Sequence, residues 1–305
     1  MGARDGSGAG SAAKDGRKAS PLFEATLLLA VLFLGTNPVA VKYAVGYVPP
    51  LPFVAIRFLL AGLLLLGLVR LLRPEGGLRK KDLPAMAGVG VIGVGMNNVA
   101  FTSGVSMTTA SETALIYAAV PVWGMILGSV LGLERPTWRG ILGVGLAFSG
   151  VGVIVYGGLG EGGTSLTGDL LVVVATMCWG SYAVLSLPLL RRYSPLTVAA
   201  YTMLFGGLAA LPLGLPGFLS LDWGTVSAGA WTAVAYSTLL VAAFGFFAWQ
   251  RGVSRIGANK MLVYQYLITL VGVVSGIVLF SEGFGIDKAL GGAILLAGVY
   301  LARRQ

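Results

Sequence analysis

Two ionisable residues, Arg57 and Glu112, stand inside long apolar stretches of the sequence. A charged side chain in the hydrocarbon core of a bilayer is costly, so such residues usually face an interior cavity and carry function. An arginine can bind a carboxylate and a glutamate can bind an ammonium group, which together suit a small zwitterion. We predict that Arg57 and Glu112 form an ion pair that gates one side of the molecule. The alternative is that both side chains extend to the lipid headgroups.

Further residues could form the wall of a binding site or its gates. The carboxamides Asn37, Asn97 and Asn98 are expected in the same half of the membrane as Arg57. They could contact a bound molecule, or they could only join helices through hydrogen bonds. The remaining candidates are Tyr117, Trp179, Tyr182, Lys260, Tyr264 and Gln265. Aromatic walls suit an apolar group, whereas Lys260 could instead be one of the basic residues that mark the cytoplasmic face.

The composition indicates a membrane protein. Of the 305 residues, 56% are hydrophobic and 11% are charged, and the mean hydropathy is +0.86. A soluble domain carries about 25% charged residues. The apolar runs are about 20 residues long without period-two alternation, which predicts membrane-spanning helices and excludes a transmembrane β-barrel.

Several chemistries are excluded by residue types that the sequence lacks. The chain has no histidine and a single cysteine, Cys178, which leaves no plausible zinc or haem site and no internal disulfide. We therefore expect no metal and no cofactor. An integral-membrane enzyme would need a nucleophile with a base or a metal cluster, and the sequence shows neither. The net charge of +9 is attributed to loops that set membrane orientation, so we expect no nucleic-acid partner.

Most of the sequence is duplicated. Residues 104–134 recur 148 positions later, where Gly104 corresponds to Gly252 and Glu134 to Glu282. Upstream of this stretch the offset between corresponding residues is 145. Self-similarity at a fixed offset indicates a repeated structural unit. The two glutamates close helix ends on opposite faces, and we expect them to anchor these corners rather than to carry protons.

The duplication divides the chain into three parts. Residues 1–20 are a polar segment, rich in Gly and Ser, that we expect to be disordered and cytoplasmic. Residues 21–156 and 167–303 form the two repeats, with five expected membrane spans in each. The ten spans are residues 22–44, 51–72, 83–104, 109–132, 138–156, 167–190, 195–214, 228–251, 256–280 and 286–303.

The odd number of spans in each repeat fixes their relative direction. A chain that crosses the membrane five times ends on the side opposite to the one where it began. The second repeat must therefore enter the membrane from the opposite side to the first. Such inverted repeats are a hallmark of secondary transporters, whose substrate site lies near mid-membrane between the repeats. Basic residues gather in alternate loops, so the positive-inside rule places both termini in the cytoplasm. We therefore predict an all-α, multi-pass protein of the cytoplasmic membrane.

Short motifs recur in a fixed order along both repeats. They are Leu34-Gly35-Thr36-Asn37-Pro38, Trp179-Gly180-Ser181, Ile56-Arg57-Phe58-Leu59-Leu60-Ala61, Thr109-Ala110-Ser111-Glu112-Thr113-Ala114 leading to Pro121, Leu133-Glu134-Arg135 and Ser281-Glu282-Gly283. In these motifs the chain after residue 20 resembles the ten-helix transporters of the drug/metabolite transporter superfamily, of the EamA type. Thr269 stands at the position that corresponds to Pro121, so the sequence does not predict a matching helix break in the ninth span.

The resemblance implies a transporter of small metabolites, commonly an exporter of amino acids or related compounds, that uses neither ATP nor a cofactor. We expect a small amphipathic substrate to move outward by alternating access. A proton-coupled multidrug exporter that uses Glu112 and a passive channel are the alternatives. The expected partners are the substrate and membrane lipid. The sequence is compatible with a monomer and leaves substrate identity, direction of flux and coupling ion open.

Overall fold

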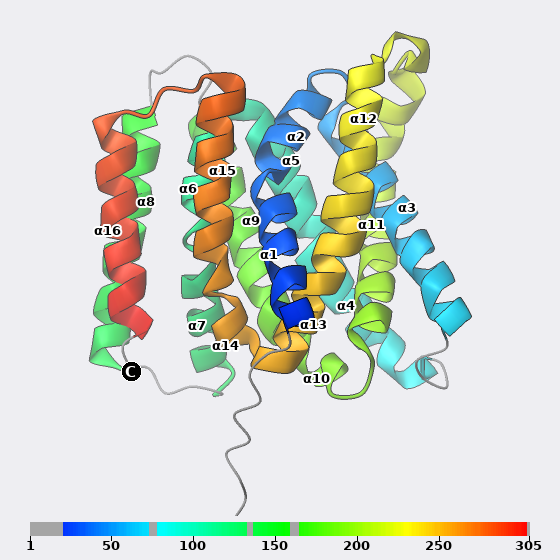
Figure 1. Cartoon of the computed structure of the whole chain (residues 1–305), viewed down its shortest axis with the longest axis horizontal. Helices are drawn as coiled ribbons and strands as arrows, with labels where there is room; N and C mark the ends of the chain where they lie inside the picture. Colours follow the sequence, from blue (N-terminus) through cyan, green and yellow to red (C-terminus); the bar gives the residue numbers. More distant parts are fainter. Residues whose placement is uncertain (1–20, 73–77, 133–136, 159–164, 304–305) are drawn as a thin grey trace, which may run out of the picture.

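The computed structural model describes residues 21–72, 78–132, 137–158 and 165–303, and within these ranges the chain is helical without β-strands (Figure 1). The first repeat contains α1 (Pro21–Gly35), α2 (Asn37–Val45), α3 (Pro50–Leu72), η1 (Lys80–Asp82), α4 (Leu83–Gly90), η2 (Val91–Met96), α5 (Asn97–Met107), α6 (Ala110–Tyr117), α7 (Val120–Val130) and α8 (Trp138–Gly158). The second repeat contains α9 (Leu166–Leu185), α10 (Leu187–Leu190), α11 (Pro195–Ser220), η3 (Trp223–Thr225), α12 (Ala228–Tyr236), η4 (Ser237–Gly245), α13 (Phe246–Ile256), α14 (Ala258–Met261), α15 (Tyr264–Phe280) and α16 (Ile286–Arg303).

Most of these helices join end to end into membrane spans. In the described part of the chain, nine helical segments are long and apolar enough to cross a bilayer. The tenth predicted span is α16, an 18-residue helix that carries Asp287, Lys288 and Arg303 and is therefore more polar than the other nine. It packs along α8 and lies parallel to the other spans (Figure 1). The predicted all-helical membrane fold is confirmed.

The helices run the length of the bundle in alternating directions. Helix α1 begins and α16 ends at the same end of the bundle, which we call the terminal end (Figure 1). At the other end, here the distal end, α2 connects to α3 and α15 connects to α16. The first repeat starts at the terminal end and the second starts at the distal end, so the repeats are inverted relative to each other.

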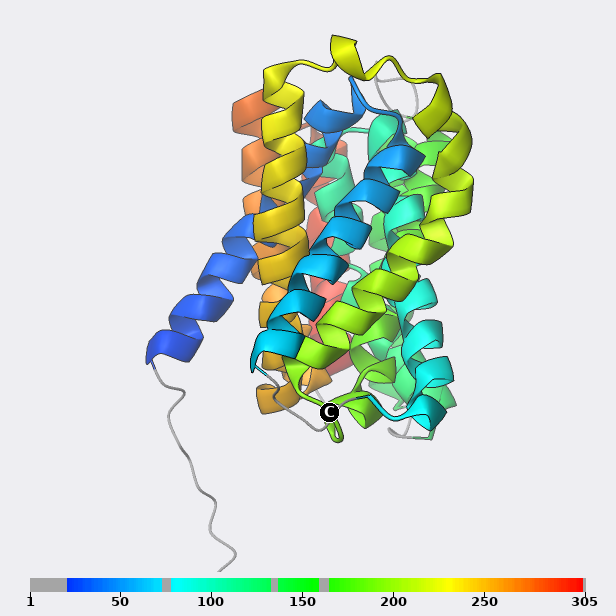
Figure 2. The ribbon, with the colours of Figure 1, turned by 90° about the vertical axis from the view of Figure 1, so that its right-hand side faces the viewer.

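The pairing of α3 with α11 shows how the duplication is expressed in packing. These helices lie side by side along one face of the bundle (Figure 2). Gly62 packs against the backbone of Leu204, and Gly207 packs against the backbone of Leu59. Adding 145 to Leu59 and Gly62 gives Leu204 and Gly207, so the two contacts are equivalent. Small residues of this kind let membrane helices approach closely.

Several spans are interrupted along their length. The first span breaks at Thr36, where Pro38 restarts the helix as α2, and the fourth breaks at Ala118 and Ala119 before α7. Proline is well suited to the first turn of a helix because it lacks the N–H that would be unpaired there. The ninth span breaks at Leu262 and Val263, and α15 continues unbroken through Thr269. Both repeats therefore have the break, but at positions that do not correspond in sequence.

Candidate functional site

A small cavity lies where the interrupted spans of both repeats meet. It measures about 50 Å³. A water molecule needs roughly 10–15 Å³ by this measure, so the cavity holds a few waters and no metabolite in this conformation. Six of the predicted site residues line it: Asn37, Asn97, Asn98, Tyr117, Trp179 and Gln265. Apolar walls come from Leu34, Phe101, Phe246 and Ile268.

The carboxamides of α5 form one polar side of this cavity. The Asn97 Nδ2 donates to the Tyr117 hydroxyl at 3.0 Å and to the Ala175 carbonyl at 2.8 Å. The Asn98 Nδ2 donates to the Val94 carbonyl at 3.0 Å and to the Asn97 Oδ1 at 2.9 Å. Val94 lies in η2, a π-helical turn whose wider spacing leaves carbonyls available to side chains. This network fixes the orientation of both amides.

Aromatic side chains form the wall toward the terminal end. The Trp179 Nε1 donates to the Gln265 Oε1 at 3.2 Å. The Trp179 ring stacks on Tyr182 with ring centroids 5.5 Å apart and meets Phe246 at 4.9 Å and Trp249 at 5.0 Å. Tyr182 and Trp249 lie one turn closer to the terminal end than the residues that touch the cavity. Packed aromatic rings therefore fill the bundle between the cavity and the terminal end.

Arg57 lies outside the cavity wall but contacts it through one residue. Its side chain is 0% exposed. The Nη2 donates to the Asn37 Oδ1 at 3.0 Å, and the Nε donates to the Ser237 carbonyl at 3.0 Å. The guanidinium carbon also lies 4.9 Å from the centroid of the Phe58 ring, which is a cation–π distance. Arg57 is thus a buried cation that is one hydrogen bond from the cavity.

The predicted ion pair between Arg57 and Glu112 is wrong for this conformation. The guanidinium donates to Asn37 and to Ser237, and its remaining nitrogen, Nη1, has no hydrogen-bond partner among the described residues. Glu112 instead lies in the first turn of α6, where its backbone N–H donates to the Thr109 Oγ1 at 3.2 Å. Similar depth in the membrane did not bring the two charges together, because rotation about each helix axis also decides which side chains meet.

Glu112 belongs to a polar cluster at the distal end. The Glu112 Oε2 accepts from the Thr108 hydroxyl at 3.2 Å. Lys42 donates to the Thr108 carbonyl and lies within electrostatic range of Glu112 and Glu282. Each of these side chains comes from a different span or corner. The cluster therefore ties the first, fourth and ninth spans together above the cavity.

Glu282 fastens the corner between α15 and α16 to α6. Its two carboxylate oxygens accept from the backbone N–H groups of Ala110 and Ser111, each at 2.7 Å. A carboxylate is well placed at a helix N-terminus, where free N–H groups and the helix dipole are both favourable. This is the helix anchor predicted for Glu282. Glu134, its partner in the repeat, lies outside the described residues.

The remaining candidates lie away from the cavity. Tyr182 is buried, and its hydroxyl is 2.9 Å from the Thr202 Oγ1. Lys260 is exposed in α14 and borders a second hollow, near the terminal end, of about 300 Å³. Tyr264 begins α15 and packs against the hydrophobic core without lining the cavity. None of these three residues lines the cavity, and Tyr182 contacts its wall through the Trp179 ring.

Besides the apolar wall residues, two residues that supply polar groups at the site were not singled out as candidates from the sequence. Ser237 contributes a backbone carbonyl at the start of the π-helical segment η4, and no side-chain pattern signals such a group. Thr269 lines the cavity at the position that corresponds to Pro121. The one sign of its role in the sequence was that the two repeats differ at this position, with threonine in place of proline. Within the described ranges, no group of three or more metal-ligating side chains occurs.

Comparison with known proteins identifies the family. The sequence matches the EamA-like transporter family over residues 22–156 and 166–304. The chain belongs to this family, and both repeats are matched separately. A solved crystal structure with 21% sequence identity covers 92% of this chain and 96% of its own, with a TM-score of 0.65, which shows the fold.

Three curated relatives are named as transporters. "Uncharacterized transporter YyaM" of Bacillus subtilis (strain 168) is 29% identical, covering 89% of this chain and 90% of that protein. A "Probable terminal-alkyne amino-acid exporter" of Streptantibioticus cattleyicolor is 34% identical, covering 74% and 75%. A "Probable biotin transporter" of Pseudomonas aeruginosa is 26% identical, covering 91% and 96%. The protein is therefore a multi-pass membrane transporter. The names of the family and of these relatives describe transporters and not enzymes.

Proposed function

We propose that this transporter is a secondary carrier that exports a small amphipathic metabolite, an amino acid or a related compound, by alternating access. The observation that carries the proposal is the cavity between the repeats, which is lined by Asn37 and Asn97 from the first repeat and by Gln265 from the second. In transporters built from inverted repeats, substrate sites lie between the repeats at interrupted helices.

Packed groups lie on both sides of the cavity along the bundle, which favours a carrier over a channel. Toward the distal end, Lys42, Glu112 and Glu282 hold three spans together. Toward the terminal end, the rings of Trp179 and Trp249 are in contact. An open pore needs a continuous water path, whereas a carrier alternates between two closures.

The substrates named for two of the relatives share a chemical feature, and this feature supports a small acid as the substrate of this protein. A terminal-alkyne amino acid and biotin both combine a carboxylate with an apolar carbon chain. The cavity of this chain likewise has a polar side around Asn97 and an apolar side that includes Phe101 and Ile268. We therefore extend the substrate class of these relatives to this protein as part of the proposal.

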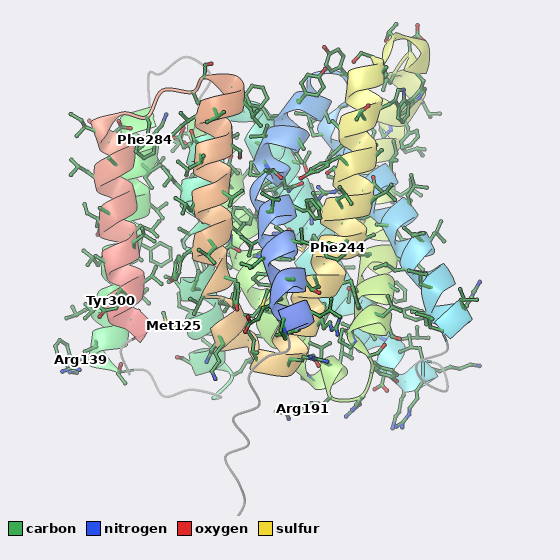
Figure 3. The ribbon with its side chains drawn as sticks, viewed as in Figure 1. Met125, Arg139, Arg191, Phe244, Phe284 and Tyr300 are labelled. Atoms are coloured by element: carbon green, nitrogen blue, oxygen red, sulfur yellow. The ribbon has the colours of Figure 1, made fainter. Side chains whose placement is uncertain are left out.

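Membrane orientation follows from the charges of the two ends. Arg139 and Arg191 lie at the terminal end, and Phe284 lies at the distal end (Figure 3). Lys80 and Lys81 also belong to the terminal end, where η1 begins the third span. The positive-inside rule supports a cytoplasmic position for the terminal end. A location in the cytoplasmic membrane is part of the proposal.

The proton-coupled multidrug alternative is less well supported by this arrangement. It assigns proton transfer to Glu112, but that carboxylate accepts a hydrogen bond from Thr108 at a helix start and does not line the cavity. A proton carrier in an exchanger must be reached alternately with the substrate. We therefore keep the metabolite carrier as the proposal.

Counterflow in proteoliposomes tests the proposal. Vesicles loaded with one amino acid at high concentration should transiently accumulate the labelled compound from outside, and the initial rate should saturate. Ala175→Trp, which places a bulky ring beside Asn97, should remove the activity, whereas Leu219→Trp on the outer surface of α11 should not. Linear uptake without counterflow would indicate a channel, and flux that requires a pH gradient would indicate the proton-coupled alternative.

A further inference from the structure

We propose that the cavity recognises its substrate by a carboxylate, through Asn37, Gln265 and Arg57, and does not require the substrate to carry an ammonium group. The inference rests on the proposed carrier function and specifies its substrate class as apolar carboxylic acids. α-Amino acids belong to this class, and so do acids that lack the amino group. It departs from the zwitterion site that the sequence predicted.

The first step concerns which end of each amide faces the cavity. The Asn37 Oδ1 accepts from the guanidinium of Arg57, and a guanidinium can only donate. The Gln265 Oε1 accepts from the indole N–H of Trp179, which also can only donate. Both amide orientations are therefore fixed by chemistry. In each case the NH₂ group, a donor, is left for the cavity.

The donor of Gln265 is unusual because it is buried without a partner. The Gln265 side chain is 1% exposed, and its Nε2 has no hydrogen-bond acceptor among the described residues. The Thr269 hydroxyl, which also lines the cavity, has no partner there either. An unpaired buried donor is unfavourable, so a ligand that supplies an acceptor at this place is favoured.

Tyr117 adds a further donor. Its oxygen accepts from the Asn97 Nδ2, and that nitrogen also donates to the Ala175 carbonyl, so the direction of both bonds is set. The Tyr117 hydroxyl keeps its own hydrogen for a ligand. The acceptors are the Asn97 Oδ1, which already accepts from Asn98, and the Asn98 Oδ1, whose amide uses both of its hydrogens elsewhere. The donors, which are the amide nitrogens of Asn37 and Gln265 and the Tyr117 hydroxyl, outnumber these two oxygens, and this balance suits an anion or a carbonyl.

The charged residues near the cavity decide whether an anion or a neutral carbonyl group is the better ligand. Arg57 is 0% exposed, and its Nη1 has no hydrogen-bond partner in the part of the chain that the structure describes. Among the residues that the structure describes, no aspartate or glutamate lines the cavity. Glu112, the residue expected to bind an ammonium group, is instead held at the start of α6 by Thr108. A buried cation with a free donor, set in a low dielectric, favours a negative ligand beside it.

The helix breaks do not decide the sign of the charge. The cavity meets the N-terminal turn of α2 at Asn37, which favours an anion, and the C-terminal turn of α1 at Gly35, which favours a cation. These opposite partial charges largely cancel. The selectivity therefore comes from the side chains, above all from Arg57 and the two amide groups that point their nitrogens inward.

A competition experiment on the unaltered protein tests the inference. Four compounds with one apolar body are compared: leucine, isocaproate, leucinamide and isopentylamine, together with the corresponding phenylalanine series. Binding is measured by the shift in melting temperature of the purified transporter. We expect leucine and isocaproate to bind within about threefold of each other and the amide and amine at least about tenfold more weakly, a difference of roughly 1.4 kcal/mol.

The outcomes separate this inference from the carrier function. Binding of leucinamide or isopentylamine as tight as that of isocaproate would overturn the carboxylate requirement. Binding of leucine without isocaproate would show that the ammonium group is needed, and no binding of any acid in either series would also reject the inference. Loss of counterflow with acid binding retained would contradict only the carrier function.

Arg57 variants test the residue that reads the charge. Arg57→Gln should reduce the preference for isocaproate over its neutral amide, isocaproamide, to below about threefold, whereas Arg57→Lys should retain a preference. Arg255→Gln is the matched control, because that guanidinium also lies over an aromatic ring, Phe23 at 5.0 Å, but near the terminal end. Unchanged preference in Arg57→Gln would remove Arg57 from the site. The measurements on the unaltered protein decide the carboxylate requirement even where a variant folds poorly.

Discussion

The contact between Asn37 and Arg57 in the first repeat has an exact positional counterpart in the second repeat. Adding 145 to Asn37 and Arg57 gives Tyr182 and Thr202. The first pair is joined by a hydrogen bond of 3.0 Å and the second by one of 2.9 Å. The same two helix positions therefore meet in both halves, but one contact involves a charge and the other joins two neutral hydroxyls.

This difference shows what duplication determines and what it leaves free. The shared offset fixes which positions touch, because both repeats fold in the same way and then pack in opposite directions. The residue types at those positions have diverged. Among the described residues, the first repeat places the Arg57 cation one hydrogen bond from the cavity, and the second repeat has the neutral Thr202 at the corresponding position. We infer that the interaction energy of an anionic substrate with the first repeat differs from its interaction energy with the second.

The largest expected effect comes from making the second repeat resemble the first. Thr202→Arg puts a guanidinium at a position that is 0% exposed and beside Tyr182, which cannot neutralise it. An uncompensated buried charge destabilises a protein by about 3–5 kcal/mol. We expect the purified variant to melt far below the parent protein, or to be lost in the membrane fraction. Thr202→Val, which keeps the shape, is the control, and equal stability of the two variants would show that this half accepts a charge.

Double-mutant cycles on both pairs measure the comparison directly. We expect a coupling energy of about 2 kcal/mol for Asn37 and Arg57, because hydrogen bonds to charged groups contribute about 1.5–3 kcal/mol. For Tyr182 and Thr202 we expect about 1 kcal/mol, as for neutral groups. The substitutions are Asn37→Ala with Arg57→Met, and Tyr182→Phe with Thr202→Val, with stability measured in detergent. Equal couplings would mean that the charge does not distinguish the two repeats.

The sequence was sufficient for the architecture because that part of the problem depends on long, regular signals. Apolar runs locate the spans, and the offset of 148 relates the helix starts at Ala110 and Ala258. The helix break in the ninth span was not predictable, because it relies on no proline and falls at Leu262 instead of near Thr269. Tertiary packing, rather than local sequence, sets its place.

The partners of Arg57 could not be read from the sequence. Depth along a span follows from counting residues, but the rotation of the helix decides whether Arg57 meets Asn37 or Glu112. One of its two acceptors is the backbone carbonyl of Ser237, which becomes available because η4 is π-helical. A widened helical turn of this kind leaves no pattern in residue types. The sequence therefore indicated the amides near the cavity but not the arrangement that sets their orientation.

The two ends of the bundle offer a second comparison, in which substitutions should change stability less than those at Asn37, Arg57 and Thr202. At the distal end, Glu282 caps α6 through two backbone N–H groups, those of Ala110 and Ser111. Glu282→Ala should lower the free energy of unfolding by about 1–2 kcal/mol, in the range measured for lost helix caps. Glu282→Gln keeps one acceptor and should lose less. A melting temperature of the alanine variant equal to that of the parent would show that this corner is not fastened by the cap.

The terminal end is held by a different kind of contact, and we expect the smallest effect there. The Tyr193 hydroxyl donates to the Asp82 Oδ2 at 2.6 Å, and Arg192 donates to the Oδ1 at 2.8 Å. Because Arg192 remains as a partner of Asp82, Tyr193→Phe should lower the melting temperature by less than Glu282→Ala does.

The pH dependence of the Tyr193 contact distinguishes it from a simple packing contribution. The hydrogen bond to the Asp82 carboxylate raises the pKa of Tyr193 above its usual value of 10.0. A group whose pKa is raised in the folded state stabilises fully below its unfolded pKa and loses that contribution as pH rises through the folded value. The difference in melting temperature between the parent and Tyr193→Phe should therefore be constant from about pH 6 to about pH 9 and shrink above about pH 10. A difference that persists unchanged at higher pH would mean that the Tyr193 hydroxyl does not stabilise this end by donating its proton to Asp82.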